Sequence, residues 1–133
     1  MNRKRIVTTA VATTLAGAVV AVPVVALTSG PAFADQERNG SCSGAGTYEL
    51  SVDKERGGFE VDTEVDTRAA NQQWRITIKH DGNVATRVVR TSDNEGEVSR
   101  DIFRNNTKGK DVFSFRAKNL DTGSLCTASI TAR

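Results

Sequence analysis

The chain has 133 residues, of which 18 are lysine or arginine, 16 are aspartate or glutamate and one is histidine. Three of the basic residues, Arg3, Lys4 and Arg5, stand at the N-terminus, so the rest of the chain carries 15 basic and 16 acidic side chains. A balance this close to neutral excludes attraction to nucleic acid or to an anionic membrane through net charge, and it leaves only a local patch of one sign.

The first 34 residues are predicted to be a secretory signal peptide. The three basic residues precede a charge-free run from Ile6 to Leu27, and Ala32 and Ala34 supply the small side chains that a cleavage site needs. We place cleavage before Asp35 and expect a secreted, extracellular protein. The alternative is an uncleaved membrane anchor, because residues 6–27 are long enough to span a bilayer, although Pro23 interrupts them.

The two cysteines, Cys42 and Cys126, are predicted to form a disulfide. They lie near the two ends of the mature chain, and an oxidising exterior makes the bridge their default state. A metal site built on two thiolates is the alternative, but no second pair of cysteines or histidines exists to complete a zinc site.

From residue 47 onward the sequence alternates with the period of a β-strand. Phe59, Val61, Thr63 and Val65 alternate with acidic residues, which is typical of a strand buried on one face. The same pattern predicts seven strands, at residues 48–53, 59–66, 74–79, 84–91, 98–103, 113–118 and 125–131. Hairpin turns are expected at Asp81-Gly82-Asn83 and at Asp121-Thr122-Gly123, because the glycine, asparagine and aspartate residues in them tolerate a positive φ.

Seven short antiparallel strands with regular turn signals predict an all-β sandwich of the immunoglobulin or fibronectin type III kind, with a closed barrel as the alternative. The domain is expected to occupy residues 47–133, preceded by a flexible N-terminal segment, 35–46, that carries Cys42. Phe59, Trp74, Phe113 and Phe115 all have inward parity, so no aromatic platform for stacking sugars or bases is expected from them.

Two segments resemble small, uncharacterised secreted proteins of soil-dwelling bacteria. They run from Trp74 to Gly82, a tryptophan strand with its hairpin, and from Arg116 to Cys126, a hairpin leading into a cysteine strand. The resemblance covers most of the mature chain and implies bacterial export and the sandwich fold. It implies no activity.

Strand parity, with the strands assigned to the two sheets of a fibronectin-like sandwich, sorts the outward charges by sign. Strands one, two and five would form an acidic sheet, and strands three, four, six and seven a basic one that could face a ligand. The acidic set is Glu49, Asp53, Glu60, Asp62, Glu64 and Asp66, and the basic set is Arg75, Lys79, Arg87, Arg116 and Lys118. A basic sheet would bind an anionic cell-envelope polymer or an acidic patch of another extracellular protein. The alternative is that both faces serve solubility.

No catalytic, cofactor or metal motif is predicted, and we expect a protein that is not an enzyme. His80, the only histidine, flanks a hairpin and is expected to be a solvent-exposed turn residue instead of the base of a hydrolase. Asp93, Glu95 and Glu97 could offer oxygens to calcium, but their spacing fails the EF-hand pattern and indicates a polar turn.

The sequence therefore predicts a secreted, non-enzymatic binding or interaction module. We expect neither a nucleic-acid partner nor, once the signal peptide is cleaved, a membrane partner. A secreted inhibitor of an extracellular hydrolase is the alternative, using residues 92–97 or 105–111 as an exposed loop. Phe103 has outward parity if Val98 and Ile102 face inward, unless a bulge near Arg100 and Asp101 shifts the register. An outward Phe103 could anchor a partner, and the alternative is an edge contact to a neighbouring loop.

Overall fold

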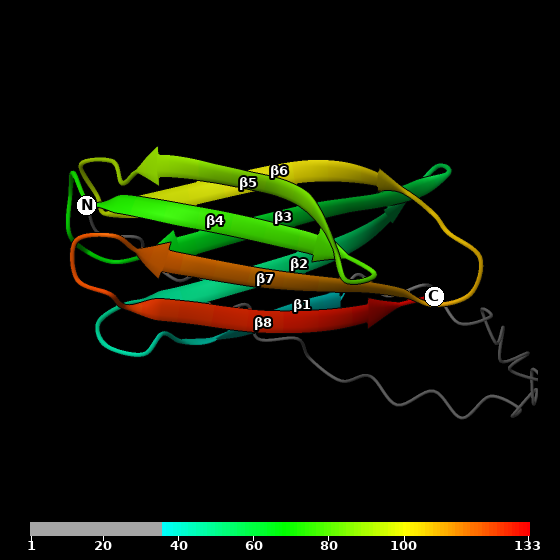
Figure 1. Ribbon diagram of the computed structural model, residues 1–133, viewed down its shortest axis with the longest axis horizontal. Helices are drawn as coiled ribbons and strands as arrows, with labels where there is room; N and C mark the ends of the chain where they lie inside the picture. Colours follow the sequence, from blue (N-terminus) through cyan, green and yellow to red (C-terminus); the bar gives the residue numbers. More distant parts are fainter. Residues whose placement is uncertain (1–35) are drawn as a thin grey trace, which may run out of the picture. The chain divides into compact units, whose positions relative to one another are not determined.

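The computed structural model describes residues 36–133, which form eight antiparallel strands and no helix (Figure 1). The strands are β1 (Gln36–Ser41), β2 (Thr47–Glu55), β3 (Gly58–Asp66), β4 (Gln73–His80), β5 (Asn83–Thr91), β6 (Glu97–Asn105), β7 (Asp111–Asn119) and β8 (Leu125–Ala132). They form two sheets, with strand orders β1-β2-β3-β6 and β5-β4-β7-β8. In Figure 1 the second sheet lies in front of the first, as the second layer of a sandwich.

Residues 1–34, the predicted signal peptide and its alternative as a membrane anchor, lie outside the described residues, as does the cleavage point before Asp35. Within residues 36–133, nothing helical has the length and apolar character required to cross a membrane.

The all-β, two-sheet fold predicted from the sequence is confirmed, and the strand count is corrected from seven to eight. The seven expected strands are β2 to β8, and they divide between the sheets as expected, with β2, β3 and β6 in one and β4, β5, β7 and β8 in the other. The additional strand is β1, which lies in the segment 35–46 that we expected to be flexible. It pairs with β2 from Gln36 opposite Val52 to Ser41 opposite Thr47.

The core lies between the two sheets and follows the period of two in the sequence. Inward residues of β2, β3, β4, β7 and β8 are almost fully buried, whereas most of their neighbours along each strand are exposed or half-buried. The largest are Trp74, Phe59, Phe113, Phe115, Leu50, Ile76 and Ile78. The rings of Phe59 and Phe113 meet edge to face across the sheets, 5.5 Å apart, which joins the two layers at the centre of the core.

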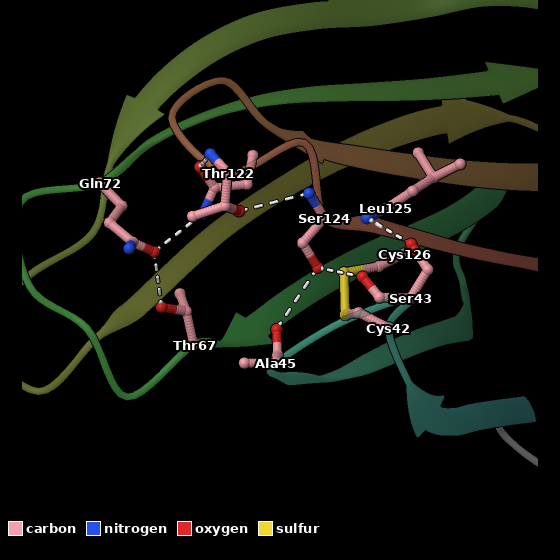
Figure 2. The surroundings of a disulfide bond; sticks show 10 residues. Cys42, Ser43, Ala45, Thr67, Gln72, Thr122, Ser124, Leu125 and Cys126 are labelled. Atoms are coloured by element: carbon pink, nitrogen blue, oxygen red, sulfur yellow. Dashed lines mark hydrogen bonds between the residues drawn. A yellow bond between two sulfur atoms is a disulfide. The ribbon is translucent and has the colours of Figure 1, made fainter.

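A disulfide between Cys42 and Cys126 joins the end of β1 to β8, as predicted (Figure 2). A backbone bridge pairs Ser43 with Leu125 beside it, and the Ser124 hydroxyl donates to the carbonyl oxygen of Ser43 at 2.6 Å. The bridge therefore fastens the edge of one sheet to the edge of the other. A disulfide is the state of cysteines in an oxidising compartment.

Candidate functional site

The five basic residues predicted from strand parity lie together on the outer surface of the β5-β4-β7-β8 sheet. Arg75 on β4 is opposite Lys118 on β7, and Thr77 is flanked by Arg87 on β5 and Arg116 on β7. All five basic side chains are exposed. We call this set, Arg75, Lys79, Arg87, Arg116 and Lys118, the basic face.

Acidic residues are missing from this surface. Strands β4, β5 and β8 contain no aspartate or glutamate, and the one acid of β7, Asp111, is buried. Among residues 36–133, none of the five cations forms an ion pair. Like charges that face each other across paired strands repel, so the basic face gains electrostatically from a negatively charged partner.

Two adjoining hollows run along the basic face. One has a volume of about 380 Å³ and is lined by four of the five basic residues, Arg75, Arg87, Arg116 and Lys118, together with Thr77. The other has a volume of about 520 Å³ and adds Lys79 with the hydroxyls of Ser114, Thr127 and Ser129. The hydroxyls were not singled out from the sequence, although outward parity on β7 and β8 would have found them. Together the hollows offer positive charge and hydrogen-bond donors to one elongated ligand.

The opposite outer surface, on the β1-β2-β3-β6 sheet, is acidic. All six predicted residues lie on it, and it also holds Glu37, Glu97 and Asp101. No lysine or arginine occupies an outward position of these four strands. We call this set, Glu37, Glu49, Asp53, Glu60, Asp62, Glu64, Asp66, Glu97 and Asp101, the acidic face. Asp101 was missed although the alternation of residues 98–103 places it outward, and Glu37 was missed because β1 itself was not predicted.

Four pairs of carboxylates lie directly opposite each other across the acidic face. They are Glu49 with Glu64, Asp53 with Glu60, Asp62 with Asp101 and Asp66 with Glu97. Such pairs are destabilising.

The repulsion shows in the protonation of the carboxyls. The Glu37 carboxylate, followed by burial and by Glu64, raises the pKa of Glu49. The Asp62 carboxylate is the main reason that the pKa of Glu60 is raised, and the Glu64 carboxylate has the same effect on the pKa of Glu97. A cationic partner bound to the acidic face would therefore reduce the repulsion between its carboxylates.

His80 is buried, so the prediction of a solvent-exposed turn residue is wrong. Only 6% of the residue is exposed, and its ring stacks on Phe113 at 4.5 Å. Its Nε2 atom lies 2.6 Å from Oδ1 of the buried Asp111 and 3.4 Å from Oδ2 of Asp81. The sequence missed this pairing because Asp111 is 31 residues away and reaches His80 only through the pairing of β4 with β7.

The Asp111 carboxylate is held ionised by its hydrogen bonds. Burial alone would raise the pKa of Asp111, but donors from His80 and Thr107 outweigh it and lower the pKa. The Oδ1 atom accepts from the Thr107 backbone N–H at 3.1 Å and from the Thr107 hydroxyl at 2.8 Å. Because an ionised carboxylate only accepts, the Nε2 atom of His80 must be the donor.

This cluster also has the composition of a metal site, since one atom each from His80, Asp81 and Asp111 lie within 4.8 Å of one another. Most of these atoms are already engaged, however: Asp111 Oδ1 accepts three hydrogen bonds, and Asp81 accepts from the Val112 N–H at 2.8 Å, whereas Asp111 Oδ2 is buried without a hydrogen-bond partner among residues 36–133. Within residues 36–133, the hydrogen-bond and ion-pair partners of His80 are carboxylates, and neither a hydroxyl nor a thiol is hydrogen-bonded to the imidazole. The cluster fastens the β4–β5 turn to the loop before β7.

Internal hydrogen bonds hold the two loops, 92–97 and 105–111, that the sequence offered as inhibitory or calcium-binding segments. In the turn at 92–97, the Asp93 carboxylate accepts the backbone N–H groups of Glu95 and Glu97, both at 2.9 Å, and these bonds lower the pKa of Asp93. The acids of this turn are exposed. In the loop at 105–111, Thr107 is bound to Asp111, and Lys108 and Lys110 point to solvent.

Phe103 lies on the acidic face, as its parity predicted. It is 51% exposed and stands opposite Glu60. The register between β3 and β6 is unbroken from Gly58 to Asp66, so no bulge turns the ring inward. The irregularity in register lies instead between Ile78 and Lys79, where β4 pairs with β5.

Comparison of the chain with family models, with curated proteins and with solved structures finds no match in any of the three.

Proposed function

We propose that this chain is a secreted, non-enzymatic binding module whose basic face binds an anionic polymer of the cell envelope. The observation that carries the proposal is a continuous hollow surface lined by five cations, none of which is ion-paired to a described residue. An acidic patch on another extracellular protein offers the same charges in a less regular arrangement.

Two structural features support export and the finer fold assignment. The disulfide between Cys42 and Cys126 suits an oxidising, extracellular compartment. Strands β2, β3 and β6 against β5, β4, β7 and β8 give the division expected for a fibronectin-like sandwich, with β1 added at the edge of the first sheet. We take the protein as an immunoglobulin-like or fibronectin type III-like module of this kind.

A repeating polyanion suits the spacing of the basic residues. Arg116 and Lys118 alternate along β7, so their Cα atoms are about 6.6 Å apart, and Arg75 and Lys79 on β4 are about 13 Å apart. An isolated surface ion pair contributes at most about 1 kcal/mol, so useful affinity needs several pairs formed at once. A polymer with closely repeated phosphates or carboxylates provides them.

The experiment is a titration of fluorescently labelled inorganic polyphosphate, followed by anisotropy, at about 50 mM and about 500 mM salt. Wild type is compared with R116E/K118E, which reverses two charges in the hollow. The matched control, K108E/K110E, makes the same two reversals in the exposed loop before β7. We expect the hollow variant to lose about tenfold or more in affinity at low salt, which is about 1.4 kcal/mol, and the loop variant to bind nearly as wild type does.

Equal losses in the two variants would show attraction to overall charge only and would overturn a site on the basic face. Absence of polyphosphate binding by wild type at low salt would overturn the proposal itself. The hydrolase alternative is tested separately, with a broad panel of chromogenic substrates and His80→Ala as the control, and we expect no turnover by wild type.

A further inference from the structure

The two sheets are the layers of a sandwich (Figure 1), so their outer surfaces point in opposite directions. These surfaces carry opposite charges, as the basic face and the acidic face. We infer that the acidic face of one copy docks onto the basic face of a second copy, so that the sandwiches stack head to tail. This goes beyond polyanion binding, because the partner is the protein itself and the acidic face takes part.

Charge complementarity selects the opposite face over the same face. Two basic faces brought together would set arginines against lysines, and two acidic faces would add to the four like-charge pairs already present in one copy. An acidic face against a basic face instead supplies Arg75, Arg116 and Lys118 with carboxylates. Residues 36–133 carry 15 basic and 15 acidic side chains, so no net charge keeps the copies apart.

Each face also offers an apolar contact among its charges. Phe103 stands exposed on the acidic face opposite Glu60. On the other sheet, Val89 is 52% exposed opposite Arg75, and Val84 is 50% exposed opposite Lys79. These residues lie on the edge strands β6 and β5, so a half-exposed aromatic and two valines give each face an apolar contact along one side of its charges.

The area available suits a weak, reversible contact. A four-stranded sheet whose longest strands have nine residues covers at most about 30 Å by 19 Å, or about 570 Å². Two such faces remove about 1,100 Å² from water, which is near the lower end of specific interfaces and above the ~800 Å² typical of crystal contacts. We therefore expect association at micromolar to millimolar concentration instead of a permanent oligomer.

When the acidic face of one copy binds the basic face of the next, the assembly does not close as a symmetric dimer. Each added copy leaves one acidic and one basic face free at the ends of the stack, so stacks grow with concentration and have no fixed size. Polyanions would compete for the same basic face, so adding them should dissociate the stacks.

The test is sedimentation velocity at low salt, over a wide range of protein concentration, with wild type and two charge-reversal variants. R116E/K118E has a damaged basic face and an intact acidic face, and E60K/E64K has the reverse. We expect the weight-average sedimentation coefficient of wild type to rise with concentration without a plateau, and to return to the monomer value at about 500 mM salt. Each variant alone should stay monomeric, and the control K108E/K110E should associate as wild type does.

The decisive measurement is the mixture of the two variants, because each keeps the face that the other lacks. Head-to-tail docking predicts a one-to-one dimer that grows no further. Monomeric wild type at every concentration, or a mixture that contains no dimer, would overturn the inference. Wild-type association that survives both variants would place the interface elsewhere and overturn it too.

Failure of this inference and failure of the proposed function give different results. E60K/E64K is expected to be monomeric with its basic face intact, so polyphosphate binding by this variant tests the proposed function without self-docking. All variants are first compared with wild type by the fluorescence of the buried Trp74, so that a misfolded variant is recognised.

Discussion

The Nε2 atom of His80, at the end of β4, lies 2.6 Å from Oδ1 of Asp111, at the start of β7. Both residues are buried, and Thr107 brings two further donors to the same carboxylate oxygen. The pair joins two strands that are neighbours in the sheet but 31 residues apart in the chain. His80 is the only histidine in the sequence, and its burial in this pair differs from the solvent-exposed position that its turn sequence predicts.

Replacing Asp111 by alanine should lower the free energy of unfolding by about 3 kcal/mol, because the buried His80 imidazole and two donors of the exposed Thr107 lose their acceptor. Denaturant unfolding followed by Trp74 fluorescence measures the loss. The double variant H80F/D111L removes both polar partners and should recover part of it. A D111A protein as stable as wild type would show that the pair contributes nothing to the fold.

The same pair should make the protein sensitive to acid. The pKa of Asp111 is lower in the folded than in the unfolded chain, so the ionised carboxylate stabilises the fold at neutral pH. This contribution is lost as the pH falls below about 4 and through the folded-state pKa. We expect the melting temperature of wild type to fall steeply there and that of D111A to fall less. If the melting temperatures of wild type and D111A fell equally as the pH is lowered, this assignment would be contradicted.

Removing the disulfide should cost several kcal/mol. The bridge closes a loop with a sequence separation of 84 residues. On the chain-entropy model, a loop of that length contributes about 4.5 kcal/mol. The variant C42S/C126S, compared with wild type with and without reductant, measures the effect by denaturant unfolding. Hydrogen exchange should show the amides of β1 opening first, because this strand lacks a buried apolar face. An unchanged free energy of unfolding after reduction would show that the disulfide does not stabilise the fold.

The sequence was sufficient for features that depend on alternation along a strand. Phe59, Trp74 and Phe113 face inward because parity decides which way each side chain points. The separation of the basic and acidic faces also required the division of the strands between two sheets, which the expected fibronectin-like topology supplied. The Asp81–Gly82 turn followed from its residues, and both have positive φ, 50° and 81°.

Features that depend on contacts across the fold could not be predicted in this way. Strand β1 has the sequence QERNGS, with no apolar residue to reveal a buried side, and it exists by backbone pairing to β2. The contact between His80 and Asp111 depends on the pairing of β4 with β7. That pairing is not specified by the alternation of residues along either strand. The hollows on the basic face likewise arise from side chains of four strands brought side by side.

Gly58 should tolerate no side chain. A Cβ atom there would lie 2.2 Å from the carbonyl oxygen of Arg104 and 2.6 Å from Cζ of Phe103. Gly58→Ala therefore has to displace the backbone of β6, and we expect a loss of about 1–3 kcal/mol in denaturant unfolding. Gly57→Ala is the matched control, since a Cβ at Gly57 meets nothing within 4 Å and only its φ of 79° is unfavourable, at about 1 kcal/mol. A smaller loss for Gly58→Ala than for Gly57→Ala would contradict the close approach.

Removing one carboxylate from the acidic face should stabilise the protein. Glu64 stands opposite Glu49 and raises the pKa of both Glu49 and Glu97 by repulsion. A carboxyl whose pKa is raised by folding binds protons more readily in the folded state, so stability falls as the pH rises through that pKa. We therefore expect Glu64→Gln to raise the melting temperature at neutral pH and low salt.

The gain should shrink as the pH is lowered below about 4, where the neighbouring carboxyls take up protons in both proteins. It should also shrink at about 500 mM salt, because screening weakens the repulsion between exposed charges. Melting curves of wild type and Glu64→Gln across this range measure both effects. A gain that is independent of pH and salt would trace the effect to packing or strand propensity, since repulsion between ionised groups requires that they be charged and unscreened.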